Sequence, residues 1–341
     1  MIDPALLEQL EVQVAPALRR GERPEVEVIG WGEISVVLGL EHEGRRFACK
    51  RMPPFPDEAA VTRYREVCAR YATVLQQEVG LALPQHEVLR TAGGARAVYY
   101  VQQGLPAEGL VDRLLHQLPA GPAAELLEMI MTRVAWLAER NRARRPVAGA
   151  QHAGRPLSVA RSSPVELAGP ARRARADLQV GLDGQVSNWV LWPVRGEDRT
   201  LWYIDTSTPL LKQEGRQLLD VGLLLSSLPA PLVPLVRLLF LKEILGRYHD
   251  PRQILRDLLG NLIKERLEHL LPPGIERVNA LLAGRLGWLG AELLTEDEVR
   301  RYYRSDARMW ALLQRLRRLD RAVKRLLRRP YPFLLPDRIE R

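Results

Sequence analysis

The sequence predicts an α+β fold, with a small antiparallel sheet and one helix first and a larger, mainly helical region after it. Short apolar runs separated by glycine-containing turns occupy the first hundred residues, and apolar residues at helical spacing dominate after residue 220. Between these regions lies a strand-turn-strand pattern that ends in an aspartate. With 341 residues, 46% of them hydrophobic, the chain can form one two-lobed unit plus an extension.

The first strands are expected around a glycine turn. Residues 28–40 predict strand, turn and strand, with Gly30 and Gly32 in the turn, and residues 46–50 form the next strand after the turn at 42–44. Glycines let backbone amides approach a phosphate, and Lys50 follows Gly30 by twenty residues on an apolar strand. The pattern indicates that glycines and lysine face the same phosphate group.

A helix is predicted over residues 57–79, where apolar residues recur at helical spacing. Glu66 lies within it, sixteen residues after Lys50, and is expected to pair with that lysine; Glu58 is the competing candidate. Two further strands are expected at about 87–90 and 97–102, joined by a glycine pair. Gln102 and Gln103 would then lead through a hinge into the second lobe.

The central motif is Asp183 followed five residues later by Asn188, and then a hairpin that ends in Asp205. Phosphoryl transfer needs a carboxylate to orient the attacking hydroxyl, oxygen ligands for Mg²⁺ and a cation on the nucleotide phosphates. The sequence offers all three parts: Asp183 as the carboxylate, Asn188 and Asp205 as the oxygen ligands, and Lys50 as the cation. The motif therefore predicts a phosphotransferase site.

Over residues 25 to 220 the chain resembles the protein-kinase-like superfamily, most closely its aminoglycoside and choline phosphotransferase branch. The resemblance implies a two-lobed fold and the use of ATP and Mg²⁺. It implies the following roles: Gly30 and Gly32 in the phosphate-covering loop, Lys50 on the phosphates with Glu66 as its helix partner, Asp183 as catalytic base, Asn188 and Asp205 as magnesium ligands, and Gln102 and Gln103 near the adenine.

Three features depart from that pattern. Gly181 stands where the superfamily usually has His, so the hydrogen bonds that brace the catalytic loop must come from elsewhere. The run 142–177, rich in Ala, Arg, Pro and Gly, indicates an inserted segment. The stretch after Asp205 lacks an Ala-Pro-Glu motif, which favours a small-molecule acceptor over a peptide. The expected division is an N-lobe (1–103), a C-lobe (104–290) and a basic C-terminal helical extension (291–341).

Beyond residue 220 helices are expected at about 234–248, 251–270, 274–282 and 296–329. Twelve Arg and Lys residues against two Asp give residues 300–329 a charge of +10, while the whole chain carries +9. Leucines recur there at helical spacing, so the expected role is a helix docked on the lobe through its leucines. Attraction to anionic lipid or to nucleic-acid phosphates is the alternative.

The cysteines, the apolar stretches and the histidines indicate the cellular environment of the protein and its metal content. Cys49 and Cys68 are the only cysteines and are expected to be buried thiols, which fits a cytoplasmic protein. The apolar stretch 221–241 contains three prolines and an arginine, so no transmembrane span is expected. The histidines predict no metal site, and His249, at a helix end, is expected to have a capping or surface role.

Two functions remain open from the sequence. One is an ATP- and Mg²⁺-dependent phosphotransferase that acts on a hydroxyl of a small molecule. The other is a pseudokinase that binds nucleotide without turnover and serves as an interaction module. Intact Asp183, Asn188 and Asp205 favour the first function, and Gly181 favours the second.

Overall fold

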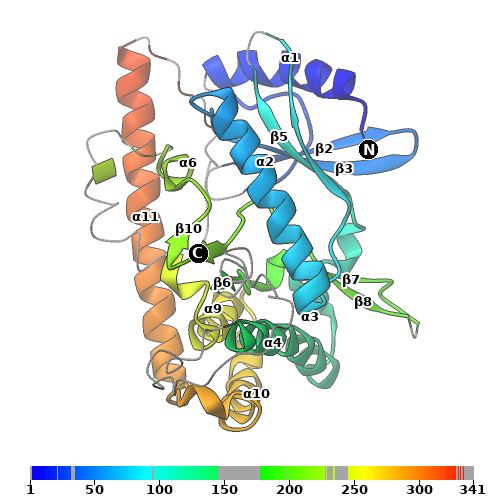
Figure 1. Cartoon of the computed structure of the whole chain (residues 1–341), viewed down its shortest axis with the longest axis vertical. Coiled ribbons are helices and arrows are strands. Elements are labelled where there is room, and N and C mark those ends of the chain that lie inside the picture. Colours follow the sequence, from blue (N-terminus) through cyan, green and yellow to red (C-terminus); the bar gives the residue numbers. More distant parts are fainter. Residues whose placement is uncertain are drawn as a thin grey trace, which may run out of the picture.

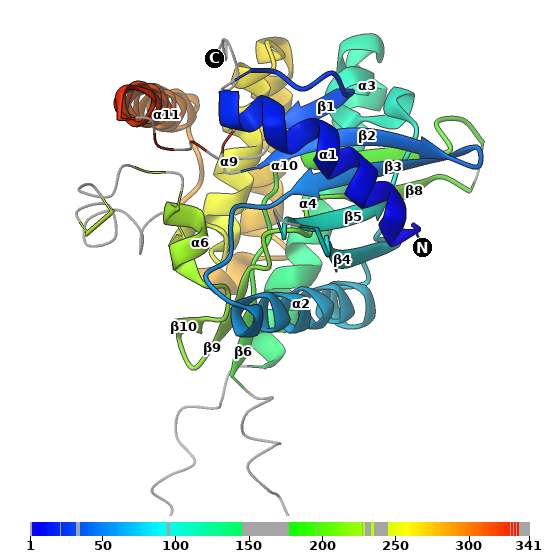
Figure 2. The same ribbon diagram turned by 90° about the horizontal axis from the view of Figure 1, so that it is seen from above.

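The N-terminal part of the chain forms a five-stranded antiparallel sheet (Figure 1), and Figure 2 shows its strands in the order β1-β2-β3-β5-β4. The computed structural model describes residues 2–20, 22–31, 35–93, 96–144, 177–196, 198–226, 228, 233–234, 245–327, 329, 331 and 333. The strands of this sheet are β1 (Val28–Trp31), β2 (Val36–His42), β3 (Arg45–Arg51), β4 (His86–Arg90) and β5 (Val98–Gln103). The predicted small antiparallel sheet is confirmed.

Helices cover both faces of this sheet. Helix α1 (Pro4–Arg20) lies across one face, as Figure 2 shows, and α2 (Glu58–Thr73) packs on the other. The side chain of Asp57 caps α2, and a π-helical turn (Val74–Val79) extends it to the predicted end. The sequence interpretation did not include α1, although its leucines and valines recur at helical spacing.

The buried carboxylate of Glu11 fixes α1 to the sheet. It accepts two hydrogen bonds from Arg51 of β3, at 2.9 and 2.8 Å, and one from the hydroxyl of Tyr99 on β5, at 2.5 Å. Neighbouring strand residues point to opposite faces, so the side chain of Lys50, next to Arg51, projects toward the second lobe.

The second lobe is mainly helical, as predicted. Its helices and strands are α3 (Val111–Gln117), α4 (Ala120–Ala143), α6 (Val221–Leu225), α9 (Pro251–Lys264), α10 (Leu271–Ala283), α11 (Glu296–Leu326), β6 (Leu178–Val180), β7 (Trp189–Trp192), β8 (Thr200–Tyr203), β9 (Leu211–Gln213) and β10 (Arg216–Gln217). Helices α4, α9 and α10 share one core with β6, β7 and β8. Short 3₁₀ turns occur at Ala107–Gly109, Val186–Asn188, Glu268–Leu270 and Gly287–Leu289.

The predicted helices at 251–270 and 274–282 correspond to α9 and α10 with shifted ends. Helix α9 stops at Lys264, because Arg266 has a left-handed φ of 59° and a 3₁₀ turn follows. Residues 145–176, which are most of the predicted inserted segment at 142–177, lie outside the described residues. Most of the predicted helix at 234–248 also lies outside them. None of the helices that the structure describes is both long and apolar enough to span a bilayer.

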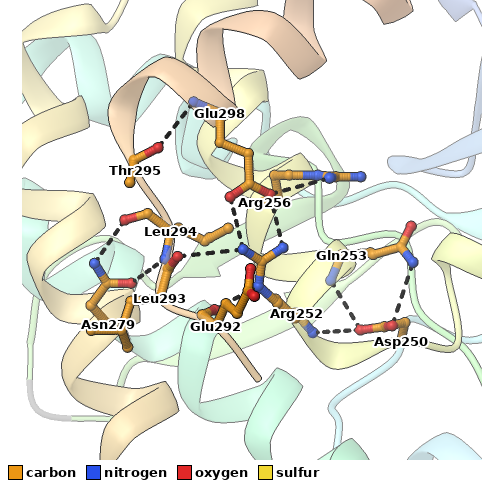
Figure 3. A network of polar contacts seen from close by, with 10 residues as sticks. All are labelled: Asp250, Arg252, Gln253, Arg256, Asn279, Glu292, Leu293, Leu294, Thr295 and Glu298. Atoms are coloured by element: carbon orange, nitrogen blue, oxygen red, sulfur yellow. Dashed lines mark hydrogen bonds and ion pairs between the residues drawn. The ribbon is translucent and has the colours of Figure 1, made fainter. Parts of the chain in front are cut away.

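The first turn of α11 is tied to α9 by a polar network (Figure 3). Thr295 caps α11 by accepting a hydrogen bond from the backbone N–H of Glu298, at 3.2 Å. The carboxylate of Glu298 accepts two hydrogen bonds from Arg252 of α9, at 2.8 and 2.7 Å, and one from Arg256, at 3.3 Å. The start of α11 therefore has a fixed position on the lobe.

The second half of α11 does not dock through its leucines, so that prediction is wrong. Leu312, Leu319 and Leu326 are exposed, whereas Arg317 is buried. The side of α11 that faces the body carries polar groups with partners there, such as Asp306, which lies 3.0 Å from Arg247. Because those contacts fix the rotation of the helix, Leu312, Leu319 and Leu326 face outward, while Leu313 and Leu316 are half-buried.

Candidate functional site

The loop that carries Asp183 follows β6 and packs on α9. The Asp183 carboxylate accepts a hydrogen bond from the backbone N–H of Gln185, at 3.1 Å, which turns the loop back on itself. The backbone N–H of Asp183 donates to the hydroxyl of Tyr203, at 3.3 Å. A Cβ on Gly184 would lie 2.8 Å from a methyl carbon of Ile254, so glycine permits close contact between the loop and α9.

The β7-β8 hairpin brings Asn188 and Asp205 together. Trp189 pairs with Tyr203, and just before this pair the carbonyl of Asn188 accepts a hydrogen bond from the N–H of Ile204, at 3.0 Å. Asp205 follows directly. The side-chain amide of Asn188 also donates to the Asp183 carbonyl, at 3.5 Å. Asp183, Asn188 and Asp205 therefore belong to one site.

Lys50 reaches this site from the other lobe. Its ammonium group lies 3.0 Å from an Asp205 carboxylate oxygen and donates to the Ser207 hydroxyl at 2.5 Å. The contact joins residues 155 positions apart. It places a cation from the sheet beside a carboxylate of the helical lobe.

The predicted ion pair between Lys50 and Glu66 is absent from the described structure. Glu66 lies on the exposed face of α2, and Glu58, the competing candidate, forms an ion pair with Arg90. The face of α2 that packs on the sheet carries Tyr64 and Cys68 instead. The helix is rotated so that tyrosine and cysteine occupy the side where a carboxylate was expected.

The other predicted nucleotide residues have mixed positions. Gly30 lies in β1, and Gly32 falls outside the described residues. The Gln102 side chain donates to the Ile204 carbonyl and to the Thr206 hydroxyl, both at 2.9 Å, and so joins the lobes. Gln103 is exposed. A cavity of about 540 Å³ adjoins both glutamines, but its described lining includes none of Lys50, Asp183, Asn188 and Asp205.

Two acidic neighbours shape the electrostatics of Asp183. Burial raises the pKa of its carboxyl group well above the ordinary value, and the negative charges of Asp257 and Asp205 raise it further. Asp257 is buried on α9 and accepts a hydrogen bond from the hydroxyl of Tyr302, at 2.6 Å. A raised pKa makes a carboxylate a stronger base, which suits a group that accepts a proton in catalysis.

The structure explains why residue 181 is a glycine. A Cβ there would lie 2.6 Å from the Tyr248 carbonyl oxygen and about 3.0 Å from the His249 ring, so only glycine fits. Neighbouring segments also hold the loop in place through hydrogen bonds. Gly181 donates to the Leu210 carbonyl at 2.7 Å and accepts from the Tyr71 hydroxyl at 2.9 Å, while Leu182 donates to the Tyr248 carbonyl at 2.8 Å.

A further brace comes from α9, where the buried Asn261 side chain accepts a hydrogen bond from the N–H of Val186, at 2.9 Å. The predicted capping or surface role of His249 is wrong. Asp250 caps α9, and the His249 ring packs beside Gly181, where burial lowers its pKa to about 3. The sequence interpretation missed Tyr71, Asp257 and Asn261, because no local motif marks a residue that supports a loop from a distant helix.

The two lobes and the site between them define a protein-kinase-like fold, in which a sheet lysine meets a loop of aspartates and asparagine from a helical lobe. The chain belongs to a family of unknown function (DUF6206), whose model matches residues 9–159 and 170–321. A search of the curated proteins gives no match.

Three solved structures are similar at 14% sequence identity each. WaaP in complex with acyl carrier protein has a TM-score of 0.35, with 87% of this chain and 96% of that chain covered. The microcompartment-associated aminopropanol kinase has a TM-score of 0.33, covering 87% and 93%. The kinase domain of Mycobacterium tuberculosis PknI has a TM-score of 0.30, covering 73% and 74%. All three TM-scores are below 0.5.

Proposed function

We propose that the protein is an ATP- and Mg²⁺-dependent phosphotransferase that transfers the γ-phosphoryl group to a hydroxyl of a small molecule. The observation that carries this proposal is the contact between Lys50 and Asp205 across the lobes, beside the loop of Asp183 and Asn188. These are the residue types that phosphoryl transfer requires. Free thiols at Cys49 and Cys68 support a cytoplasmic location.

The residues present fit a magnesium ion. Asn188 and Asp205 offer one amide oxygen and one carboxylate oxygen from adjoining ends of the β7-β8 hairpin. Mg²⁺ commonly binds one or two such groups and takes its remaining ligands from phosphates and water. When bound, the ion would neutralise charge on the phosphates. Among the described residues, no group of three or more His, Cys, Asp or Glu forms a metal site of another kind.

The chain's own residues would divide the work. Lys50 would bind nucleotide phosphate oxygens and exchange its contact with Asp205 for them. Asp183 would orient the acceptor hydroxyl and take its proton as the hydroxyl oxygen bonds to phosphorus and ADP leaves. The hydrogen bonds to Tyr71, Tyr248 and Asn261 would hold the loop in place for this step.

One observation favours the second candidate, a pseudokinase that binds nucleotide without turnover. In the described structure Lys50 lacks the helix carboxylate that would hold it toward phosphates, because Glu66 is exposed. Lys50 is held by Asp205 and Ser207 instead. In that case nucleotide would bind while turnover stays absent.

The test is nucleotide binding and phosphate release by the purified protein with ATP or GTP, with and without Mg²⁺. Wild type is compared with Asp205→Ala, Asp183→Asn and the control Asp198→Ala, an exposed aspartate on the β7-β8 turn. We expect Asp205→Ala to abolish Mg²⁺-dependent binding, Asp183→Asn to abolish turnover but keep binding, and the control to match wild type. Binding without turnover in wild type would favour the pseudokinase, and no binding would refute both functions.

A further inference from the structure

The outer side of α11 carries an exposed apolar line. The α11 stripe consists of Leu312, Leu316, Leu319, Val323 and Leu326, which follow one another in alternating steps of four and three residues. That spacing places them along one side of a helix. Leu312 is 55% exposed, Leu319 61%, Val323 45% and Leu326 83%, while Leu316 is half-buried. Figure 2 shows α11 nearly end-on at the edge of the molecule.

Arginines border the α11 stripe. Arg308 and Arg315 are exposed, and each precedes a leucine of the stripe by four residues, which places them next to it on the helix surface. Arg304 and Arg301, one and two turns before Arg308, are exposed as well. The outer face of α11 therefore combines large apolar side chains with a row of positive charges.

The acidic residues of this stretch do not neutralise that face. Asp306 and Asp320 are the only acids between residues 299 and 327. Asp306 forms an ion pair with Arg247 at 3.0 Å, on the side of α11 that faces the body. Asp320 pairs with Lys324 at 2.8 Å and is mostly buried. The exposed charge beside the stripe is therefore positive.

We infer that the α11 stripe and its arginines dock the protein on the surface of an anionic phospholipid bilayer. A helix with leucines on one face and arginines beside them lies in the plane of such an interface, with the leucines among the acyl chains and the guanidinium groups on the headgroup phosphates. Charge complementarity selects this occupant. The inference does not depend on the proposed phosphotransferase activity.

Two other occupants fit less well. A second copy of the chain packed stripe to stripe would bring Arg308 and Arg315 of both copies together, and like charges at a helical seam oppose association. A nucleic acid would satisfy the arginines but leave Leu319 and Leu326 in water. Of these three occupants, a bilayer with anionic groups above an apolar layer satisfies both sets of side chains.

The experiment is co-sedimentation of the full chain with lipid vesicles. We expect binding to phosphatidylcholine vesicles that contain about 30% phosphatidylserine, and no binding to pure phosphatidylcholine, in about 0.1 M NaCl. The paired change Leu319→Ala and Leu326→Ala keeps helix-forming residues and should lower the partition coefficient about tenfold or more. Arg308→Gln with Arg315→Gln should lower it about tenfold and weaken its salt dependence.

Val12→Ala is the matched control, because Val12 is exposed on α1, on the other lobe. It should bind vesicles like wild type, and circular dichroism melts should show that all variants fold. Equal binding to neutral and anionic vesicles would overturn the inference, as would leucine variants that bind like wild type. A lipid-free dimer that the leucine variants abolish would assign the stripe to a second copy. Tighter binding to DNA or RNA than to anionic vesicles would assign it to nucleic acid.

Discussion

At the scale of single residues, the loop that carries Asp183 depends on a position without a side chain. Gly181 lies against the Tyr248 carbonyl and the His249 ring, and its own backbone groups bond to Leu210 and Tyr71. A histidine at this position would occupy the space that these partners fill. The braces of the loop have therefore moved to other elements, and Gly181 does not by itself indicate lost catalysis.

Gly181→Ala should destabilise the protein by about 1 to 3 kcal/mol, because the new methyl group would force the loop away from Tyr248. Chemical denaturation of wild type and variant would measure the change. The matched control is Gly121→Ala in α4, where a Cβ would meet nothing within 4 Å. That change should be neutral or stabilising by up to about 1 kcal/mol. Equal stability of the two variants would contradict the steric argument.

A second residue-scale prediction concerns Asp257, whose negative charge raises the pKa of Asp183. A base must be ionised, so turnover should rise as pH increases through the raised pKa of Asp183. Asp257→Asn removes the charge and keeps an oxygen for the Tyr302 hydroxyl, so the pKa of Asp183 should fall and the acidic limb of the pH-rate profile should move to lower pH.

Asp198→Asn serves as the control for Asp257→Asn, since Asp198 is exposed on the β7-β8 turn and is not among the main charges that shift the pKa of Asp183. The acidic limb of the pH-rate profile of this control should coincide with that of wild type. A profile that Asp257→Asn leaves unmoved would exclude Asp257 as a determinant of the Asp183 pKa.

At the scale of elements, apolar periodicity is sufficient to predict a helix or strand where the segment packs by its own apolar face. Helices α9 and α10 and the strands β1 to β5 occur where their spacing predicts them, although α9 ends six residues before the predicted end. The apolar spacing of α2 predicts the face that packs on the sheet, with Tyr64 and Cys68 in it, so only the expectation that Glu66 lies on that face was wrong. The rotation of α11 could not be predicted, because it is set by distant partners such as Arg247.

The base of α11 should be sensitive to the charge of Glu298. Hydrogen bonds from Arg252, together with the charges of Arg252 and Arg256, lower the pKa of Glu298. A lowered carboxyl pKa in the folded state gives stability that is present above the unfolded pKa and is lost as pH falls through the folded value. Glu298→Gln should therefore lower the free energy of unfolding by about 1 to 2 kcal/mol at pH 7.

Urea denaturation at several pH values would test the Glu298 prediction. The difference between wild type and Glu298→Gln should shrink as the solution is acidified below the ordinary glutamate pKa, because wild type then loses the same charge. The i,i+4 pair of Glu296 and Arg300 is more exposed, so Glu296→Gln should change stability by less than about 0.5 kcal/mol. Equal effects of the two variants would refute a special role of Glu298.

At the scale of the whole molecule, residues 205–207, which lie just beyond the β7-β8 hairpin, hold the lobes together. Asp205 and Ser207 contact Lys50 of β3, and the Ser207 carbonyl accepts from Tyr64 of α2, at 2.7 Å. Thr206 is fully buried. The segment that would bind Mg²⁺ is thus also the main polar joint between sheet and helical lobe, so nucleotide binding and lobe position should be coupled.

Thr206→Val tests this joint without changing side-chain shape. The Thr206 hydroxyl is within 2.7 Å of the Tyr100 hydroxyl and 2.9 Å of the Gln102 amide, both on β5. Valine would leave these buried groups with fewer partners, which should cost about 1 to 3 kcal/mol. The loss should appear at the junction, so hydrogen exchange measured by mass spectrometry should accelerate in β5 and at 204–207 but not in α10. Uniform acceleration across both lobes would instead mean that Thr206 supports global stability and does not specifically join the lobes.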